Sequence, residues 1–156
     1  MSSMTIKPAP VHRSFTVKAT PERAFDVFTA GIHRWWPRTH SIGASPQTMA
    51  VIEPRVGGRW YEIGEDGSEC PWGDVVTWEP PGRLVLAWRI NAEFKFDPAL
   101  HTEVEVRFTA EGPNATRVEF EHRLLENMGE RAAAVRESLN GGWAGIVDLY
   151  AKAAEG

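Results

Sequence analysis

The chain has 156 residues, of which 42% are apolar, and this is enough to fill the core of a single domain. Its formal net charge of −4 argues against a general nucleic-acid binder, because no basic excess is present to neutralise phosphates. The single cysteine, Cys70, excludes an internal disulfide and a cysteine-rich metal site, and no apolar run approaches the length of a membrane span.

The first ten residues, 1–10, contain no apolar signal-peptide core, so we expect a disordered lead-in followed by one domain over residues 11–156. A cytoplasmic location is the default expectation for such a chain. We expect no cofactor, because the glycine pairs of the sequence do not stand in a phosphate-binding motif. We also expect no metal, because no histidine pair has the spacing of a zinc site.

The N-terminal part of the chain predicts a strand and a helix. Residues 11–18 alternate apolar and polar side chains and are rich in β-branched residues, which is typical of a half-buried strand. Thr20 is a favourable N-cap residue, and Pro21 suits the first position of a helix. We expect this helix to end near Gly31.

A second short helical turn is predicted over residues 31–37, ended by Pro37. It contains the pair Trp35-Trp36, and two adjacent side chains of one helix cannot both face inward. We therefore expect one of them to cap the core and the other to line an opening, with the pair near the mouth of a cavity.

Six further strands are predicted downstream, separated by turns such as Asp66-Gly67, which is a strong hairpin signal. The alternation is clearest in the last two strands, where apolar residues share one face and charged residues the other. Residues 91–100 are less regular and predict a long connection at the edge of the sheet. The predicted strands are residues 49–53, 59–63, 72–78, 84–90, 102–109 and 116–124.

The longest periodic segment is the last one, Asn127 to Ala154, whose apolar residues recur every three or four positions, as in an amphipathic helix. Gly141 and Gly142 lie in the middle of this helix, and each glycine there costs up to about 1 kcal/mol relative to alanine. The order of elements predicts an α+β fold, in which a curved antiparallel sheet of six to seven strands wraps around this helix.

Several short segments together resemble a known family. They are residues 15–25 (FTVKATPERAF), Gly57-Gly58-Arg59-Trp60, Trp72-Gly73-Asp74-Val75, residues 78–84 (WEPPGRL), Thr116-Arg117-Val118-Glu119 and Gly141-Gly142-Trp143. In their order and spacing the chain resembles the START-related helix-grip (SRPBCC) superfamily, and within it the branch similar to the activator of the heat-shock-protein-90 ATPase. The resemblance covers about residues 11–154.

This resemblance implies a deep cavity between the sheet and the C-terminal helix, but it does not imply one reaction. Members of the superfamily include lipid carriers, hormone receptors, aromatase/cyclases and subunits of ring-hydroxylating oxygenases.

His122 is the first candidate for a polar group inside such a cavity. It shares its strand parity with Val118 and Phe120, so its side chain is predicted to point at the helix. A lone inward histidine is most often a core residue whose hydrogen bonds are satisfied. It also suits a group that orients a ligand or acts as a general acid or base.

Glu62 is the second candidate, because it points into the cavity if Trp60 does. A carboxylate among tryptophans suits general acid/base chemistry. In the alternative, Tyr61 and Ile63 face inward and Glu62 is solvated. The same question arises for Asp74.

Gly142 has two interpretations. Either the helix packs closely there on a bulky strand residue such as Trp88, or the missing side chain leaves volume for a ligand. We favour the second. The ligand-binding residues predicted from the sequence are Trp35, Trp36, Trp60, Glu62, Trp88, Phe108, Phe120, His122, Gly142, Trp143, Ile146 and Tyr150.

The leading hypothesis is a protein that binds a small hydrophobic or aromatic ligand. The first alternative is a cyclase- or hydrolase-like enzyme with His122 or Glu62 as general acid/base. The second is a chaperone-interaction module, for which the sequence offers little support. A homodimer is a possibility that the sequence leaves open.

Overall fold

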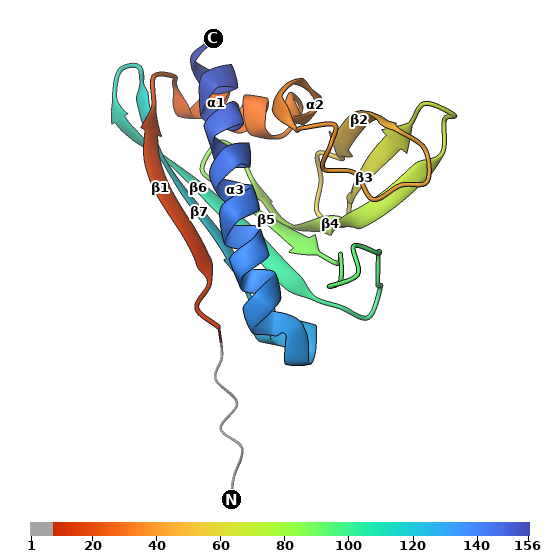
Figure 1. Cartoon of the computed structure of the whole chain (residues 1–156). Coiled ribbons are helices and arrows are strands. Elements are labelled where there is room, and N and C mark those ends of the chain that lie inside the picture. The colour runs from red at the N-terminus through yellow and green to blue at the C-terminus, as the bar shows by residue number, and fades with distance from the viewer. Residues whose placement is uncertain (1–7) are drawn as a thin grey trace, which may run out of the picture.

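The computed structural model describes residues 8–156, so residues 1–7 of the expected lead-in lie outside the described part. One antiparallel sheet with the order β1-β7-β6-β5-β4-β3-β2 curls around a long C-terminal helix (Figure 1). This confirms the predicted α+β helix-grip fold. The strands are β1 (Val11–Val17), β2 (Gln47–Ile52), β3 (Arg59–Gly64), β4 (Glu69–Glu79), β5 (Arg83–Trp88), β6 (Thr102–Gly112) and β7 (Ala115–Arg123).

Two short helices follow the first strand, as predicted: α1 (Pro21–Phe28) and α2 (Ile32–Trp35). The Thr20 side chain caps α1 by accepting a hydrogen bond of 3.2 Å from the backbone N–H three residues further on, and Pro21 takes the first helical position. Both helices lie at one end of the sheet, beside the C-terminal end of the long helix (Figure 1).

The predicted C-terminal helix is present but differs in its first turns. Residues Leu125–Arg131 form a 3₁₀ helix, η1, and the α-helix α3 runs over Ala132–Glu155. The break falls at Gly129, whose φ of 75° and ψ of −142° are not helical. Glycine adopts this conformation without the steric cost that a side chain would add.

Trp35 and Trp36 are both buried, with 5% and 6% of their surface exposed. The premise that two adjacent side chains cannot both face inward is therefore wrong, whereas the expected division holds: Trp35 packs in the core and Trp36 lines a cavity. Trp36 follows the last residue of α2 and has an extended backbone, with φ −66° and ψ 125°. Its side chain no longer follows the helical period, so both indoles reach the interior.

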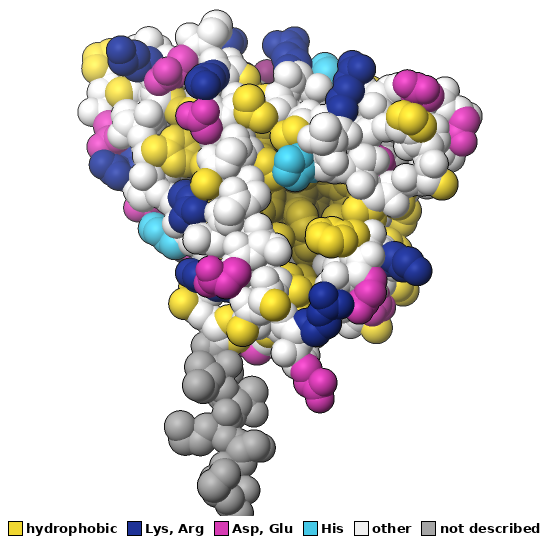
Figure 2. Space-filling view, viewed as in Figure 1, with side chains coloured by type: hydrophobic (Ala, Val, Ile, Leu, Met, Phe, Trp, Pro, Cys, Tyr) yellow, Lys and Arg dark blue, Asp and Glu magenta, His cyan; other side chains and the backbone are white. Residues whose placement is uncertain are grey.

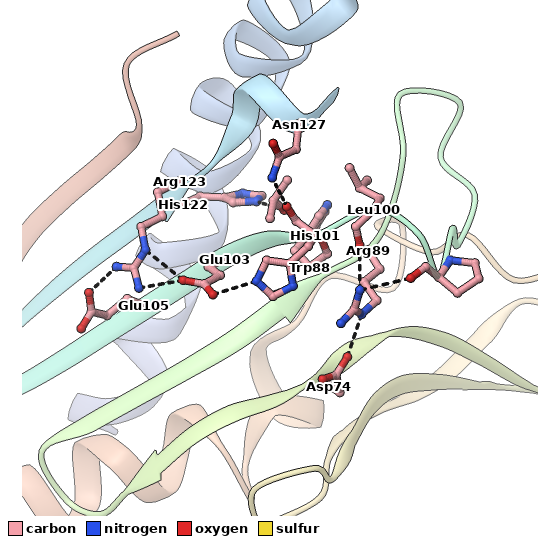
Figure 3. A network of polar contacts seen from close by, with 12 residues as sticks. Asp74, Trp88, Arg89, Leu100, His101, Glu103, Glu105, His122, Arg123 and Asn127 are labelled. Carbon is pink, nitrogen blue, oxygen red and sulfur yellow. Dashed lines mark hydrogen bonds and ion pairs between the residues drawn. The ribbon is translucent and has the colours of Figure 1, made fainter. Parts of the chain in front are cut away.

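Strand β4 does not alternate in the simple way that the sequence suggests. Its register against β5 shifts between Val75 and Thr77, and that of β3 against it shifts next to Trp72. These bulges let Trp72, Val75 and Trp78, spaced three residues apart, all contact the core. Asp74 turns away and pairs with Arg89, with 2.8 Å between carboxylate oxygen and guanidinium nitrogen (Figure 3).

An ion-pair network joins β5, β6 and β7 across the outer face of the sheet, and Figure 3 shows the part of it formed by Arg123, Glu103 and Glu105. The Glu105 carboxylate accepts hydrogen bonds from Arg83 (2.5 Å), from Arg107 (3.0 Å) and from Arg123, and Arg123 also donates to Glu103. Burial alone would raise the pKa of Glu105, but the hydrogen bonds from the three arginines outweigh it and lower the pKa to about 2.

Tyr150 anchors α3 against the short helices. Its ring packs on Phe28 and Trp35, with centroid distances of 5.1 and 5.3 Å, and its hydroxyl donates a 2.7 Å hydrogen bond to the backbone oxygen of Ala24. Burial raises the pKa of this phenol well above its usual value, so the hydroxyl remains a donor.

Tyr150→Phe removes this hydrogen bond and keeps the ring. We expect the free energy of unfolding to fall by about 0.5–1.5 kcal/mol, the usual net contribution of one hydrogen bond. Urea denaturation should show a lower midpoint with an unchanged slope. Tyr61→Phe is the control, because the Tyr61 hydroxyl makes no hydrogen bond within residues 8–156. Equal losses in the two variants would contradict the assignment.

Candidate functional site

An apolar cavity of about 370 Å³ lies between α3 and the inner face of β4 and β5. Figure 2 shows it as a hollow lined with hydrophobic side chains, with charged side chains and a histidine around its opening. Four of the lining residues are tryptophans. The lining residues are Trp36, Thr39, His40, Ser41, Ile42, Trp72, Trp88, Ile90, Phe94, Ser138, Leu139, Gly142, Trp143 and Ile146.

Five of the residues predicted from the sequence lie on this wall: Trp36, Trp88, Gly142, Trp143 and Ile146. Sequence reasoning missed the rest of the wall. Its other members lie in the loop after α2, in the connection after β5, at a bulged position of β4, and on α3 at Ser138 and Leu139. Simple strand alternation gives no signal for the loop residues or for the bulged position of β4, although Ile90 has the parity of Trp88 and Leu139 follows the helical period.

Two predicted residues lie directly behind the wall. Trp60 packs edge-on against Trp72 and Trp88, with centroids 5.5 Å away in both cases. Phe120 packs under Trp143 at 4.5 Å. They therefore support the indoles of the wall without lining the cavity themselves.

The other predicted aromatic residues lie at the far end of the core. Phe108 packs against Phe25 and Phe28, and Trp35 and Tyr150 belong to the same cluster. The Trp35 indole also donates a 2.8 Å hydrogen bond to a backbone oxygen of α1. The structure thus corrects the predicted lining: these three residues belong to the packed core beside α1.

Glu62 faces inward together with Trp60, which is the first of the two interpretations of the sequence, and only 1% of its surface is exposed. Its carboxylate accepts hydrogen bonds from the Ser41 hydroxyl (2.5 Å), from the backbone N–H groups of Ile42 (2.7 Å) and Gly43 (3.1 Å), and from the Trp72 indole (2.9 Å). All four donors belong to the protein, so Glu62 holds the loop that forms one side of the cavity.

His122 connects the Trp143 indole to the backbone of Trp88 through a chain of hydrogen bonds. The Trp143 indole donates to His122 Nδ1 at 3.1 Å. Because an indole only donates, Nδ1 carries no proton, and Nε2–H donates to the Thr102 hydroxyl at 2.9 Å. The Thr102 hydroxyl then donates to the backbone oxygen of Trp88 at 2.8 Å.

This environment keeps His122 neutral. The side chain is fully buried, and this burial lowers the pKa of the imidazole from 6.5 to about 3. Both ring nitrogens are engaged by neighbouring protein groups. His122 therefore positions Trp143, and through Thr102 the backbone of Trp88, and it presents no free nitrogen to the cavity.

Gly142 lies at the cavity, and a Cβ placed there would meet no atom of the described chain within 4 Å. The interpretation that α3 packs tightly on Trp88 at this position is therefore wrong. Gly141, the next residue, is exposed and would also meet no atom. The absence of a side chain at Gly142 leaves open space in the cavity.

A narrower space of about 130 Å³ adjoins the cavity and shares five lining residues with it. It continues between the first turns of α3 and the connection after β5, as far as Arg131 and Met128. The shared residues are Trp88, Ile90, Phe94, Ser138 and Leu139.

Within residues 8–156, no three His, Cys, Asp or Glu side chains are grouped as metal ligands. Among the helices of the same residues, none has the length and hydropathy to cross a membrane.

The sequence family described as activator of Hsp90 ATPase homolog 1-like protein matches residues 18–154. This chain belongs to that family. The match covers almost all the elements described above, including β2 to β7, both short helices and nearly all of α3. None of the curated proteins compared with it matches.

Two solved structures share 35% of their residues with this family member. One is an anthrahydroquino-gamma-pyrone synthase, Txn09, complexed with SUM; the alignment covers 96% of this chain and 99% of that one, with a TM-score of 0.67. The other is the self-sacrificing resistance protein CalC from Micromonospora echinospora, with 93% of each chain covered and a TM-score of 0.71. The Aha1 dimer from Colwellia psychrerythraea has the same fold at 18% identity, covering 95% of this chain and 97% of its own, with a TM-score of 0.65.

The buried His122 predicts a pH dependence of stability. Its pKa is lower in the folded state, so the unfolded chain binds more protons below pH 6.5. Its contribution to stability is complete above pH 6.5 and is lost as the pH falls towards 3. We expect a slope of up to about 1.4 kcal/mol per pH unit.

The measurement is the free energy of unfolding between pH 5 and 6.5, a range above the titration of Glu105. His122→Gln should remove the slope that this histidine contributes, whereas His12→Gln, at an exposed position, should keep it. The same slope in His122→Gln and the unaltered protein would refute a neutral buried imidazole.

Proposed function

We propose that this chain binds a small hydrophobic or aromatic molecule in the cavity, with residues 11–156 acting as one ligand-binding unit. The observation that carries the proposal is the wall of four indoles, Trp36, Trp72, Trp88 and Trp143, around an open volume of about 370 Å³. This volume lies within the range of small-molecule sites, which are mostly apolar and have few polar groups.

The four indoles contact one another as well as the cavity. Trp36 lies 5.0 Å from Trp72 and 5.8 Å from Trp143, and Trp88 lies 5.5 Å from Trp143, all between ring centroids. Such a continuous wall presents broad faces and edges, which suit the flat surface of an aromatic ligand. The polar groups of the lining are few: Thr39, His40, Ser41 and Ser138.

One of the two relatives at 35% identity supports this ligand class. Its name contains anthrahydroquino-gamma-pyrone, which is a fused aromatic ring system. A cavity between the sheet and α3 is present in this chain, and its four indoles offer flat apolar surfaces against which a fused aromatic ring system can pack.

Gly142→Leu tests the proposal, because it places a side chain in the open part of the cavity. With the neutral fluorescent probe N-phenyl-1-naphthylamine, we expect binding to the unaltered protein and at least about tenfold weaker binding to the variant, since a filled cavity removes the apolar contact. The matched control is Gly141→Leu, one residue further back on the exposed side of α3. It should bind the probe with unchanged affinity.

Both leucines replace a glycine inside a helix, so both variants should be as stable as the unaltered protein or more stable, by up to about 1 kcal/mol. Thermal unfolding checks this. Failure of the unaltered protein to bind the probe, or equal binding by Gly142→Leu, would overturn the proposal.

A cyclase-like reaction is the second candidate function, favoured by the 35% identity to a synthase. The two residues considered from the sequence do not suit it, because His122 is sealed in the core and Glu62 is engaged by four protein donors. His40 is the imidazole on the cavity wall, and it is exposed to solvent. In this candidate function His40 is the general acid/base.

A suitable probe is 1-(2-hydroxyphenyl)butane-1,3-dione, whose phenol oxygen attacks the distal ketone and which then loses water to give 2-methylchromone, a γ-pyrone. An active chain should accelerate this closure, and His40→Gln should reduce the rate by about 10²-fold, as expected for a general acid/base. His33→Gln, an exposed histidine of α2, is the control. No acceleration above the rate in buffer, or equal rates for the two variants, would reject this candidate.

The chaperone-interaction hypothesis stays a prediction. The family is named after an activator of a chaperone ATPase, but a family name does not give this chain a partner. The homodimer likewise stays a prediction, because the dimeric neighbour shares only the fold at 18% identity.

A further inference from the structure

Phe94 is the most exposed large hydrophobic side chain among the described residues, with 68% of its surface accessible. It lies on the connection between β5 and β6 and lines both the cavity and the narrower space beside it. Trp88 and Trp143, which line the same cavity, are at most 8% exposed. Phe94 is therefore an aromatic ring at the opening of a cavity whose four indoles are buried.

The backbone of Phe94 has a φ of 59°, in the left-handed region. This region is unfavourable for a bulky side chain, whereas glycine and asparagine tolerate it. Gly or Asn at this position would give a more stable fold, since little of the Phe94 ring is buried. The stability of the fold therefore does not explain why a phenylalanine stands here.

The turn that carries Phe94 is closed by hydrogen bonds from both sides. The Asn91 N–H donates to the oxygen of Lys95 at 2.8 Å, and the Phe94 N–H donates to the oxygen of Asn91 at 3.0 Å. The Asn91 side chain accepts from the N–H groups of Glu93 and Lys95, both at 3.0 Å. An ion pair of 3.3 Å between Glu93 and Arg131 ties the turn to the start of α3. These contacts fix the backbone of the turn beside the cavity, where the Phe94 ring remains mostly exposed.

We infer that Phe94 is a ligand-contacting residue that covers the bound molecule from the solvent side and selects for a flat aromatic ring. This inference rests on the proposed function. A planar ligand in the cavity would bury the exposed phenyl ring and stack against it, while its other surface meets the indole wall. A flexible aliphatic ligand would gain less from Phe94, because it offers no ring face to stack on.

The test compares Phe94→Ala, Phe94→Asn and Phe94→Trp by titration with N-phenyl-1-naphthylamine and with 1-dodecanol. We expect the first two variants to bind the aromatic probe about three- to tenfold more weakly, the effect of losing one ring contact, and Phe94→Trp to retain its affinity. Competition by 1-dodecanol, followed through displacement of the aromatic probe, should change by less than about twofold. Val56→Ala, which removes an exposed apolar side chain that lines no part of the cavity, should bind both compounds unchanged.

Stability gives a second, independent readout. Phe94→Asn should have an unchanged or higher melting temperature, because asparagine tolerates the left-handed backbone. Weaker aromatic binding together with unchanged or higher stability supports the inference. A lower melting temperature with unchanged affinity would show that Phe94 serves the fold and would overturn it.

The outcomes also separate this inference from the proposed function. If the unaltered protein and all Phe94 variants bind the aromatic probe equally, the inference fails and the cavity proposal stands. If the unaltered protein does not bind the aromatic probe, both fail.

Discussion

The hydrogen-bond chain from Trp143 through His122 and Thr102 to Trp88 is the contact on which the rest of the site depends. It runs from α3 through β7 and β6 to β5, so it joins the helix to three neighbouring strands. Every donor and acceptor in the chain has a partner, and a fully satisfied polar chain inside an apolar core favours one arrangement of its members. The chain therefore fixes the Trp143 indole and the backbone of Trp88, and the Trp88 indole packs with its centroid 5.5 Å from that of Trp143.

This spacing explains why an open volume persists beside Gly142. Protein interiors are close-packed, and a helix with no side chain at this point would be expected to settle onto the sheet. Trp143 on α3 and Trp88 on β5 prevent this, because their rings stand between the helix and the strand. On the other side, Glu62 fixes the loop over residues 41–43 with three of its four hydrogen bonds. Two sets of buried polar groups therefore maintain the cavity: His122 with Thr102 beneath the indoles, and Glu62 beside the loop over residues 41–43.

Much of this arrangement follows from the sequence because it depends on local rules. The order of elements, the capped start of α1 and the inward orientation of His122 come from alternation and from residue preferences at helix ends. The inward orientation of Glu62 was one of two open interpretations, since alternation alone does not say which face of β3 is buried. The likeness to the helix-grip family added the expectation of a cavity.

The remaining features depend on partners that are distant in the sequence. The bulges of β4 exist only in relation to β3 and β5. At Gly73 a Cβ would lie 1.7 Å from the Ala87 oxygen, so the close approach of these strands requires glycine. The bulges bring Trp72 to the cavity wall and leave Asp74 facing outward, and neither orientation can be predicted from the residues of β4 alone. The positive φ of Phe94 likewise arises from the closing contacts of its turn.

His122 and Glu62, the two candidates for a general acid/base in the sequence, have structural roles because they are buried and hydrogen-bonded to the protein. A histidine and a glutamate that point into a cavity suggest proton transfer, as long as their other neighbours are unknown. In the folded chain each is saturated by protein donors and acceptors, so each determines the shape of the site instead. The groups that line the cavity are indoles, the Phe94 ring, aliphatic side chains, three hydroxyls and the His40 imidazole. Such a surface would recognise a ligand mainly by its shape and by apolar contact. A reaction that needs proton transfer would have to use a group at the opening of the cavity, such as His40.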